Sequence, residues 1–118
     1  MNEPQSSLDL IKIVIKLIDA LKTIHESDRT YNDLKPENIM LDGEDVKLIG
    51  FDFVDKFSEG QETQYVEVFR GNFMLASVNQ LEFKKTSRKD DLISLAYLLI
   101  YMVNGKKMPF LNQQYDDQ

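Results

Sequence analysis

Three side chains of chemically useful types lie close together in residues 30–41, TYNDLKPENIML. Asp33 is followed two residues later by Lys35 and five residues later by Asn38. The segment reads as a polar loop that runs into a short apolar strand, and groups of these types can transfer protons and bind charged ligands. Because Asp, Lys and Asn often meet in a loop by chance, an ordinary proline-containing polar turn is the alternative interpretation.

This segment resembles the catalytic loop of protein kinases, in which His-Arg-Asp is followed by Leu or Ile, Lys, two residues and Asn. The resemblance implies that Asp33 is the base for the substrate hydroxyl, that Lys35 neutralises charge on the transferring phosphoryl group, and that Asn38 binds magnesium. Tyr31 replaces the usual His and is expected to pack in the core as a structural residue. Asn32 replaces Arg, so the cation that normally receives an activation-loop phosphate is missing.

The family's metal-binding Asp-Phe-Gly triplet has two counterparts here. Residues 39–41 and 46–49 are predicted to form a hairpin, and the resemblance places the triplet directly after it. In the first register, which the spacing favours, the triplet is Gly50, Phe51 and Asp52, so a glycine replaces the metal-binding carboxylate. In the second register Asp52 is the metal ligand, and Val54 occupies the position where a flexible glycine is expected. Phe51 is expected to pack beneath the site as a structural residue in both registers.

Two further segments are similar to the casein kinase 1 family. GNFMLASVN (71–79) resembles that family's Gly-Thr-x-x-Tyr-Ala-Ser-Ile-Asn, and after the same seven-residue gap SRKDDLISLAY (87–97) resembles Ser-Arg-Arg-Asp-Asp-Leu-Glu-Ser-Leu-Gly-Tyr. Asn72 replaces the Thr whose hydroxyl normally links the substrate-binding segment to the catalytic Asp and Lys. The resemblance implies that Asp91 is a buried structural carboxylate that holds the backbone of the catalytic loop, and a simple helix cap is the alternative.

Two apolar segments have the periodicity of helices. Residues 8–26 carry apolar side chains over a wide arc, which predicts a helix covered on more than one side. Residues 92–103 are apolar on nearly every side, which predicts a helix buried all round and capped by Asp90 or Asp91. By resemblance these are helices E and F of the kinase fold. Residues 65–69 alternate like a short strand. His25 is expected to be packed or solvent-facing, because no nucleophile or metal-ligand pattern accompanies it.

A small basic run precedes the second predicted helix. Its default interpretation is a solvated face, and the resemblance offers an anion or phosphosubstrate site as the alternative. The run consists of Lys84, Lys85, Arg88 and Lys89.

Composition and charge narrow the class of protein. With 118 residues, 42% of them hydrophobic, the chain can form one domain with a core, but a whole kinase domain is about twice as long. A net charge of -6 argues against nucleic acid or an acidic membrane surface as a partner. The absence of cysteine excludes disulfides and zinc-thiolate sites. The residues MNEPQSSLD lack the basic start and apolar core of a secretory signal, so none is expected there, and the longest apolar run, 92–103, is expected to be too short to span a bilayer. We expect an intracellular protein, cytoplasmic or associated with the cytoskeleton.

These features predict a mainly α fold with a small β-hairpin, which the resemblance identifies as a partial protein-kinase-like C-terminal lobe. It would comprise helix E, the catalytic loop, the activation segment and helix F, with the N-lobe absent. The expected organisation is a polar leader at 1–7, the kinase-like part at 8–110 and a polar tail at 111–118.

The expected function is that of a catalytically inactive pseudokinase fragment, similar to casein kinase 1, which acts as a structural or docking component of a larger assembly and needs no cofactor. The alternative is serine/threonine protein kinase activity with ATP and magnesium, as a fragment of a longer kinase chain or completed by one. Because helices E and F would lack their usual covering elements, other protein subunits are expected to cover the apolar faces of residues 8–26 and 91–103.

Overall fold

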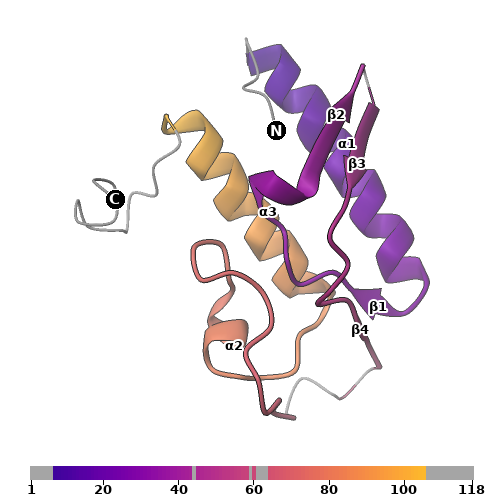
Figure 1. Cartoon of the computed structure of the whole chain (residues 1–118), viewed down its shortest axis with the longest axis vertical. Helices are drawn as coiled ribbons and strands as arrows, with labels where there is room; N and C mark the ends of the chain where they lie inside the picture. The colour runs from indigo at the N-terminus through magenta and orange to yellow at the C-terminus, as the bar shows by residue number, and fades with distance from the viewer. Residues whose placement is uncertain (1–6, 44, 59, 61–63, 106–118) are drawn as a thin grey trace.

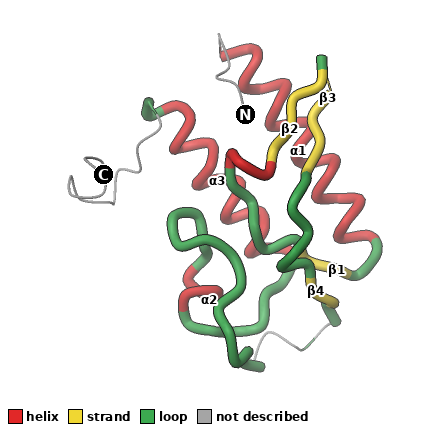
Figure 2. The backbone as a smooth tube through the Cα atoms, viewed as in Figure 1, coloured by secondary structure: helices red, strands yellow, loops and turns green. Residues whose placement is uncertain are grey.

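Two long helices and a β-hairpin form most of the fold (Figure 1). The computed structural model describes residues 7–43, 45–58, 60 and 64–105. The helices are α1 (Ser7–Glu26) and α3 (Arg88–Val103), and the hairpin is formed by β2 (Ile39–Asp42) and β3 (Asp45–Leu48). Figure 2 shows that the chain between them is largely loop. The loops are interrupted by β1 (Arg29–Thr30), a single 3-10 turn η1 (Pro36–Asn38), β4 (Asp55–Lys56) and α2 (Val78–Leu81).

Two antiparallel strand pairs position the loop that follows β1. The hairpin pairs Ile39 with Leu48, and β3 packs against α1. The second pair joins β1 to β4, which follows the hairpin, with Thr30 opposite Asp55. The loop from Tyr31 is therefore held at both ends by strand pairing. The predicted mixture of helices with a small β-hairpin is confirmed.

One hydrophobic core lies where the two long helices, the hairpin and this loop meet. α1 contributes every third or fourth residue, as expected for one face of a helix. Burial of a large apolar side chain contributes about 1.5–3 kcal/mol to the stability of the fold, so this cluster helps to attach the loop to the helices. Its buried members are Ile13, Leu17, Leu21, Tyr31, Leu34, Ile39, Leu48, Leu75, Leu95 and Leu98.

The helix α3 begins four residues earlier than predicted. The reason is a capping box, in which the carboxylate of Asp90 accepts hydrogen bonds from Ser87 N (2.8 Å) and Ser87 Oγ (3.3 Å). Asp90 therefore helps to cap the helix, whereas Asp91 lies inside it with its carboxylate directed to another segment.

The prediction that α3 is buried all round is wrong for this chain. Its buried side consists of Asp91, Ser94, Leu95 and Leu98, whereas Leu92 is 48% and Val103 is 65% exposed. Among the described residues, α3 contacts α1, β1 and the loop at Leu75, and the side that carries Leu92 and Val103 is left exposed.

Three further expectations concern the ends and the middle of the chain. The predicted strand at 65–69 is reduced to a single bridge between Tyr65 and Lys84, because the chain bends at residues 67 and 68. Most of the predicted leader and the whole predicted tail lie outside the described residues. Within the described part of the chain, no helix is long and apolar enough to cross a membrane.

Candidate functional site

The loop after β1 buries Asp33 and surrounds its carboxylate with two side-chain amides. Asp33 is 5% exposed. Asn38 Nδ2 donates to the carbonyl oxygen and to Oδ2 of Asp33, both at 2.9 Å. Asn72 Nδ2 donates a longer bond of 3.4 Å to Oδ1. The structure therefore brings together Asp33 and Asn38, two of the residues expected to form the site.

The 3-10 turn explains how Asn38 reaches back to Asp33. Pro36 opens the turn, where its fixed φ is favourable and its missing N–H is not needed. The turn closes with a hydrogen bond of 3.0 Å from Asn38 N to the carbonyl of Lys35. Lys35 itself is half-buried, and its ammonium makes no hydrogen bond or ion pair with the described residues.

Asn72 links residues 71–75 to the loop, although its replacement of threonine had put such a link in doubt. Besides its contact with Asp33, its Nδ2 donates to the carbonyl of Leu34 at 3.1 Å, and its Oδ1 accepts a bond of 2.9 Å from Leu75 N. One amide thus joins the segment at 71–75 to the loop without a hydroxyl group. An amide carries both donors and an acceptor, which a threonine hydroxyl combines in one atom.

Asp91 fastens the loop to α3 through two hydrogen bonds and makes a third with His25 of α1. Its Oδ2 accepts from Tyr31 N and its Oδ1 from Asn32 N, both at 2.8 Å. His25 Nε2 shares a third hydrogen bond of 2.8 Å with Oδ2. Asp91 is 1% and His25 is 8% exposed, so the contact lies in the interior. The carboxylate satisfies two backbone N–H groups that would otherwise be buried without an acceptor.

Gly50 lies directly against Asn38. A Cβ on Gly50 would lie 2.7 Å from Cγ of Asn38, and its φ of +78° is one that residues other than glycine adopt with strain. Ile49 N also donates to the Asn38 carbonyl at 2.8 Å. Asp52 is exposed, and among the described residues no hydrogen bond joins it to Asn38 or Asp33. The glycine, and not this carboxylate, faces the predicted metal ligand.

Tyr31 and Phe51 pack between the loop and the segment that follows β3. Tyr31 is fully buried, and its hydroxyl donates to the carbonyl of Ile49 at 2.5 Å. Burial, with a further contribution from the negative charge of Asp33, raises the pKa of the Tyr31 hydroxyl. Phe51 meets the Tyr31 ring edge-on at 5.8 Å but is 55% exposed, so it covers the site from the outside.

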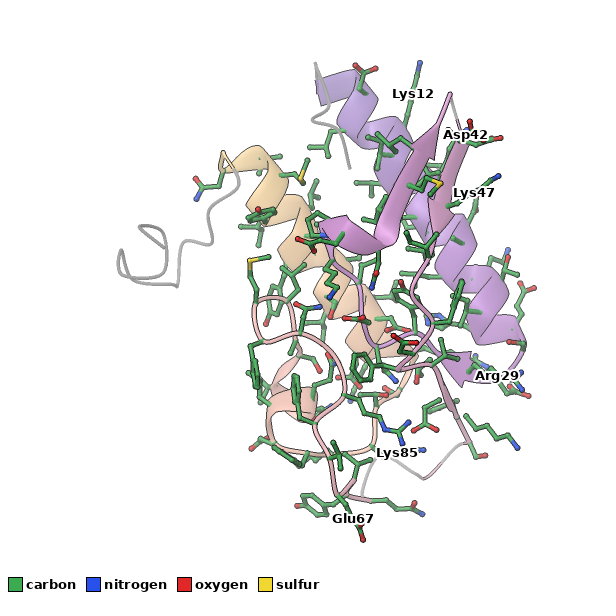
Figure 3. The ribbon with its side chains drawn as sticks, viewed as in Figure 1. Lys12, Arg29, Asp42, Lys47, Glu67 and Lys85 are labelled. Carbon is green, nitrogen blue, oxygen red and sulfur yellow. The ribbon has the colours of Figure 1, made fainter. Side chains whose placement is uncertain are left out.

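Three of the four basic residues predicted as a possible anion site pair with carboxylates from different segments. Lys84 pairs with Glu82 at 3.5 Å, Lys85 with Asp55 at 2.7 Å and Arg88 with Asp28 at 3.4 Å. Arg88 also lies over the Phe57 ring at 5.5 Å, while Lys89 is exposed at the start of α3. Lys85, labelled in Figure 3, lies beside β4. Three of the four cations thus already have a carboxylate partner.

Around Asp33 the structure offers one buried carboxylate and the side-chain oxygen of Asn38. Magnesium is usually held by one or two carboxylates together with phosphate and water oxygens. No group of three or more His, Cys, Asp or Glu side chains within the described residues could hold a metal ion. The amide nitrogen of Asn38 is bound to Asp33, and its oxygen faces Gly50, which has no side chain. In the first register, Gly50 occupies the position of the second metal ligand of the kinase pattern.

Sequence reasoning missed several residues that build this site. Gln80 Nε2 donates to the carbonyls of Asn32 and Arg70, both at 2.9 Å. The spacing Ser77-x-x-Gln80 is that of a capping box, which was a usable signal for α2. His25 gave no usable signal, because its partner Asp91 is 66 residues away in the chain. For Asn72 the resemblance marked the position, but not that an amide would bond to Asp33, 39 residues away.

Comparison with known proteins identifies the family. A model described as Protein kinase domain matches residues 2–118. The chain is 31% identical over 113 residues to "Putative serine/threonine-protein kinase R436" of Acanthamoeba polyphaga mimivirus, covering 92% of this chain and 39% of that protein. It is 32% identical over 118 residues to "Casein kinase 1-like protein HD16" of Oryza sativa subsp. japonica, covering 90% of this chain and 16% of that protein.

A similar match is found with "Casein kinase I homolog 1" of Saccharomyces cerevisiae, which is 22% identical over 124 residues, 91% of this chain and 23% of the yeast protein. The chain thus spans well under half the length of the relatives it matches. It belongs to the protein kinase family and is a casein kinase 1-like member of it.

Proposed function

We propose that this chain is a catalytically inactive, pseudokinase-like part of a kinase large lobe, which serves as a structural or docking component of a larger assembly. The observation that carries the proposal is Gly50 against Asn38, where the kinase pattern has a metal-binding carboxylate. Phosphoryl transfer is catalysed mainly by positioning and by electrostatic stabilisation of charge. A site that cannot hold the metal loses much of that stabilisation.

The proposal is tested by nucleotide binding. Thermal unfolding of the purified chain is followed with ATP alone, magnesium alone and both together. A ligand that binds the folded state adds about 2.7 kcal/mol at 100 times its dissociation constant, so even weak binding is measurable. We expect no stabilisation that requires both magnesium and ATP.

Two variants make the outcome specific. Asp52→Asn removes the exposed carboxylate that the second register would use, and Asp45→Asn is a matched change at another exposed position. A magnesium-dependent stabilisation by ATP that Asp52→Asn abolishes and Asp45→Asn leaves intact would contradict the proposal. It would favour the second register and the kinase alternative.

The docking role is supported by apolar side chains that the chain leaves in contact with water. Ile11, Ile15 and Ile18 are 55%, 54% and 44% exposed and follow one another at helical spacing along α1. On α3, Leu92, Leu99, Ile100 and Val103 are exposed as well. Apolar surface of this kind typically marks an interaction site. We propose that other protein subunits, or further parts of a longer kinase chain, cover these two faces.

This docking role has its own test. We expect the purified chain to bind an apolar dye such as ANS or to self-associate, as measured by fluorescence and sedimentation. The double substitution Ile11→Lys and Ile15→Lys should reduce both signals while the urea midpoint stays within experimental error. A wild-type chain that sediments as a monomer and binds no dye would argue against exposed docking faces.

A kinase activity in the context of a longer chain is the second candidate. The position of Asp33, buried beside Asn38 and fastened through Asp91, favours it, because this is the arrangement that the catalytic-loop pattern requires. The two candidates differ in whether magnesium and ATP bind once the site is completed. The same titration therefore separates them when it is repeated on the chain together with its native co-purifying partners.

A further inference from the structure

Asp55 lies where two cationic side chains from a distant part of the chain converge. Lys85 Nζ is 2.7 Å and Arg70 Nη1 is 3.7 Å from the same oxygen, Oδ2 of Asp55. Asp55 is 24% and Lys85 is 17% exposed, whereas Arg70 is 46% exposed. The Asp55–Lys85 pair is thus the shorter and less accessible of the two contacts, so water competes little for its charged groups.

Each of these side chains is held by backbone contacts of its own. Asp55 belongs to β4 and lies opposite Thr30 of β1, immediately before the loop that contains Asp33. The carbonyl of Arg70 accepts a bond of 2.9 Å from Gln80 Nε2. The backbone N–H of Lys85 donates to the carbonyl of Gln64 at 2.7 Å. The carboxylate therefore connects two ordered parts of the chain, β4 on one side and residues 64–85 on the other.

Asn32 completes this connection without a charge. Its Nδ2 donates to the carbonyl of Phe53 at 2.9 Å, and its Oδ1 accepts a bond of 2.7 Å from Thr86 Oγ1. An arginine at this position, as in the kinase pattern, would bring a cation to the same place. Here the cations come from Arg70 and Lys85, and the anion that they contact is part of the chain.

Little space is left for an external anion. The cavity between these residues has a volume of about 10 Å³, and Asn32, Asp55, Arg70, Lys84 and Thr86 are among its lining residues. That volume is about one water molecule and is far too small for a phosphate group.

We propose that Asp55 acts as a built-in anion, which orders residues 64–85 in the way that a phosphate orders the activation segment of phosphorylation-dependent kinases. Phosphorylation orders such segments because the added negative charge pairs with cationic side chains. The Asp55 carboxylate makes the corresponding contacts permanently, so this segment needs no modification to be ordered. The inference is independent of whether the chain binds nucleotide.

The electrostatic environment of Asp55 agrees with this role. Burial alone raises the pKa of its carboxyl group, but the hydrogen bond and positive charge of Lys85, with Lys56 N and Arg70, outweigh burial and lower the pKa overall. The carboxylate is thus held in its charged form by the residues that it connects.

Limited proteolysis with trypsin measures the order of this segment directly, because Arg70 and Lys85 are themselves cleavage sites. Asp55→Asn keeps the size of the side chain and removes its charge. Losing a contact of one to two kcal/mol changes a local equilibrium about 5-fold to 30-fold, so cleavage after Arg70 and Lys85 should accelerate by about that factor. Cleavage after Lys22 in α1 reports on global unfolding in the same sample.

Three comparisons complete the test. Glu82→Gln removes the partner of Lys84 on the surface and should leave all cleavage rates unchanged. Inorganic phosphate should slow cleavage of an Asp55→Ala variant, compared with sodium chloride of equal ionic strength. It should not slow cleavage of wild type, whose cations are already paired.

The proposal is overturned by either of two results. One is an Asp55→Asn variant that is cleaved after Arg70 and Lys85 no faster than wild type. The other is an acceleration of equal size after Lys22, which would show that Asp55 contributes to global stability and not to the order of this segment. Selective acceleration at Arg70 and Lys85 with rescue by phosphate supports it.

Discussion

Replacement of Asp91 by asparagine tests whether its carboxylate holds the catalytic loop or merely caps a helix. The wild-type side chain is 1% exposed and satisfies Tyr31 N, Asn32 N and His25 Nε2, each at 2.8 Å. Asparagine has nearly the same size, so no cavity is created. Its amide offers only one oxygen, and its NH₂ group must face a donor that the second carboxylate oxygen used to satisfy.

The expected cost follows from these contacts. A buried N–H group that loses its acceptor costs about 1–3 kcal/mol, and a hydrogen bond to a neutral acceptor is weaker than one to a charged acceptor by about 1 kcal/mol. Relief from burying a charge offsets part of this loss. We therefore expect Asp91→Asn to lower the free energy of unfolding by about 2–4 kcal/mol, a large fraction of the 5–15 kcal/mol that is typical of whole domains.

The measurement is urea unfolding of the purified chain, followed by circular dichroism at the wavelength of helix absorption, with the slope of the transition compared between variants. Asp28→Asn is the matched control, because Asp28 is exposed and forms only a surface pair with Arg88. Asparagine and aspartate are about equally good helix caps. If Asp91→Asn changes stability by no more than Asp28→Asn does, the loop-holding interpretation is refuted and the cap interpretation is favoured.

Two further predictions concern the segment after β3. Gly50→Ala should lower the free energy of unfolding by about 2–4 kcal/mol, because the new methyl group overlaps the buried Asn38 amide at a positive φ. Gly43 also has a positive φ but lies in open space, so Gly43→Ala should lower it by only about 1–2 kcal/mol. Equal urea midpoints for the two variants would contradict the packing of Gly50 on Asn38. Tyr31→Phe should cost about 1–2 kcal/mol through the lost bond to Ile49. Because the pKa of Tyr31 is raised by folding, its neutral form contributes stability that is complete below the unfolded pKa, about 10, and is lost as the pH rises above that value. Tyr31→Phe should therefore flatten the decline of the melting temperature above pH 10, and an unchanged decline would count against this origin.

The parts of the fold that could be predicted from sequence are those determined by local patterns. The helix at 7–26 and the hairpin follow from apolar periodicity and from a turn segment between two apolar runs. The burial of α3 could not be predicted, because it depends on neighbours that a periodic pattern does not identify. The strand predicted at 65–69 failed for a similar reason. Its alternation is real, but only Tyr65 finds a pairing partner, in Lys84, among the described residues.

The candidate site also has a part that could be predicted from sequence and a part that could not. The loop residues Asp33 and Asn38 were identified because they lie five positions apart in one motif. The spacing of the kinase pattern favoured Gly50 at the position of the metal-binding carboxylate, with the second register left open, and the contact of Gly50 with Asn38 is visible only in the structure. By contrast, the roles of Asn72 and Asp55 depend on contacts across 30 or more residues, between side chains that form no local pattern. Long-range polar contacts of this kind are visible only in the folded chain.

The geometry around Asp33 shows that a catalytic motif does not by itself imply catalytic activity. Its carboxylate is buried and bound to the amides of Asn38 and Asn72, and these amides in turn hold the turn and the segment at 71–75 in place. Removing the side chain of Asp33, Asn38 or Asn72 would leave polar groups of the other two without partners, which lowers the stability of any folded protein. Stability alone therefore accounts for Asp33 and Asn38, the two motif residues in this network, even in a chain that transfers no phosphoryl group. For this reason Gly50, which contributes no hydrogen-bonding side chain, is the more informative residue, because the choice between an active and an inactive site depends on the group that faces Asn38.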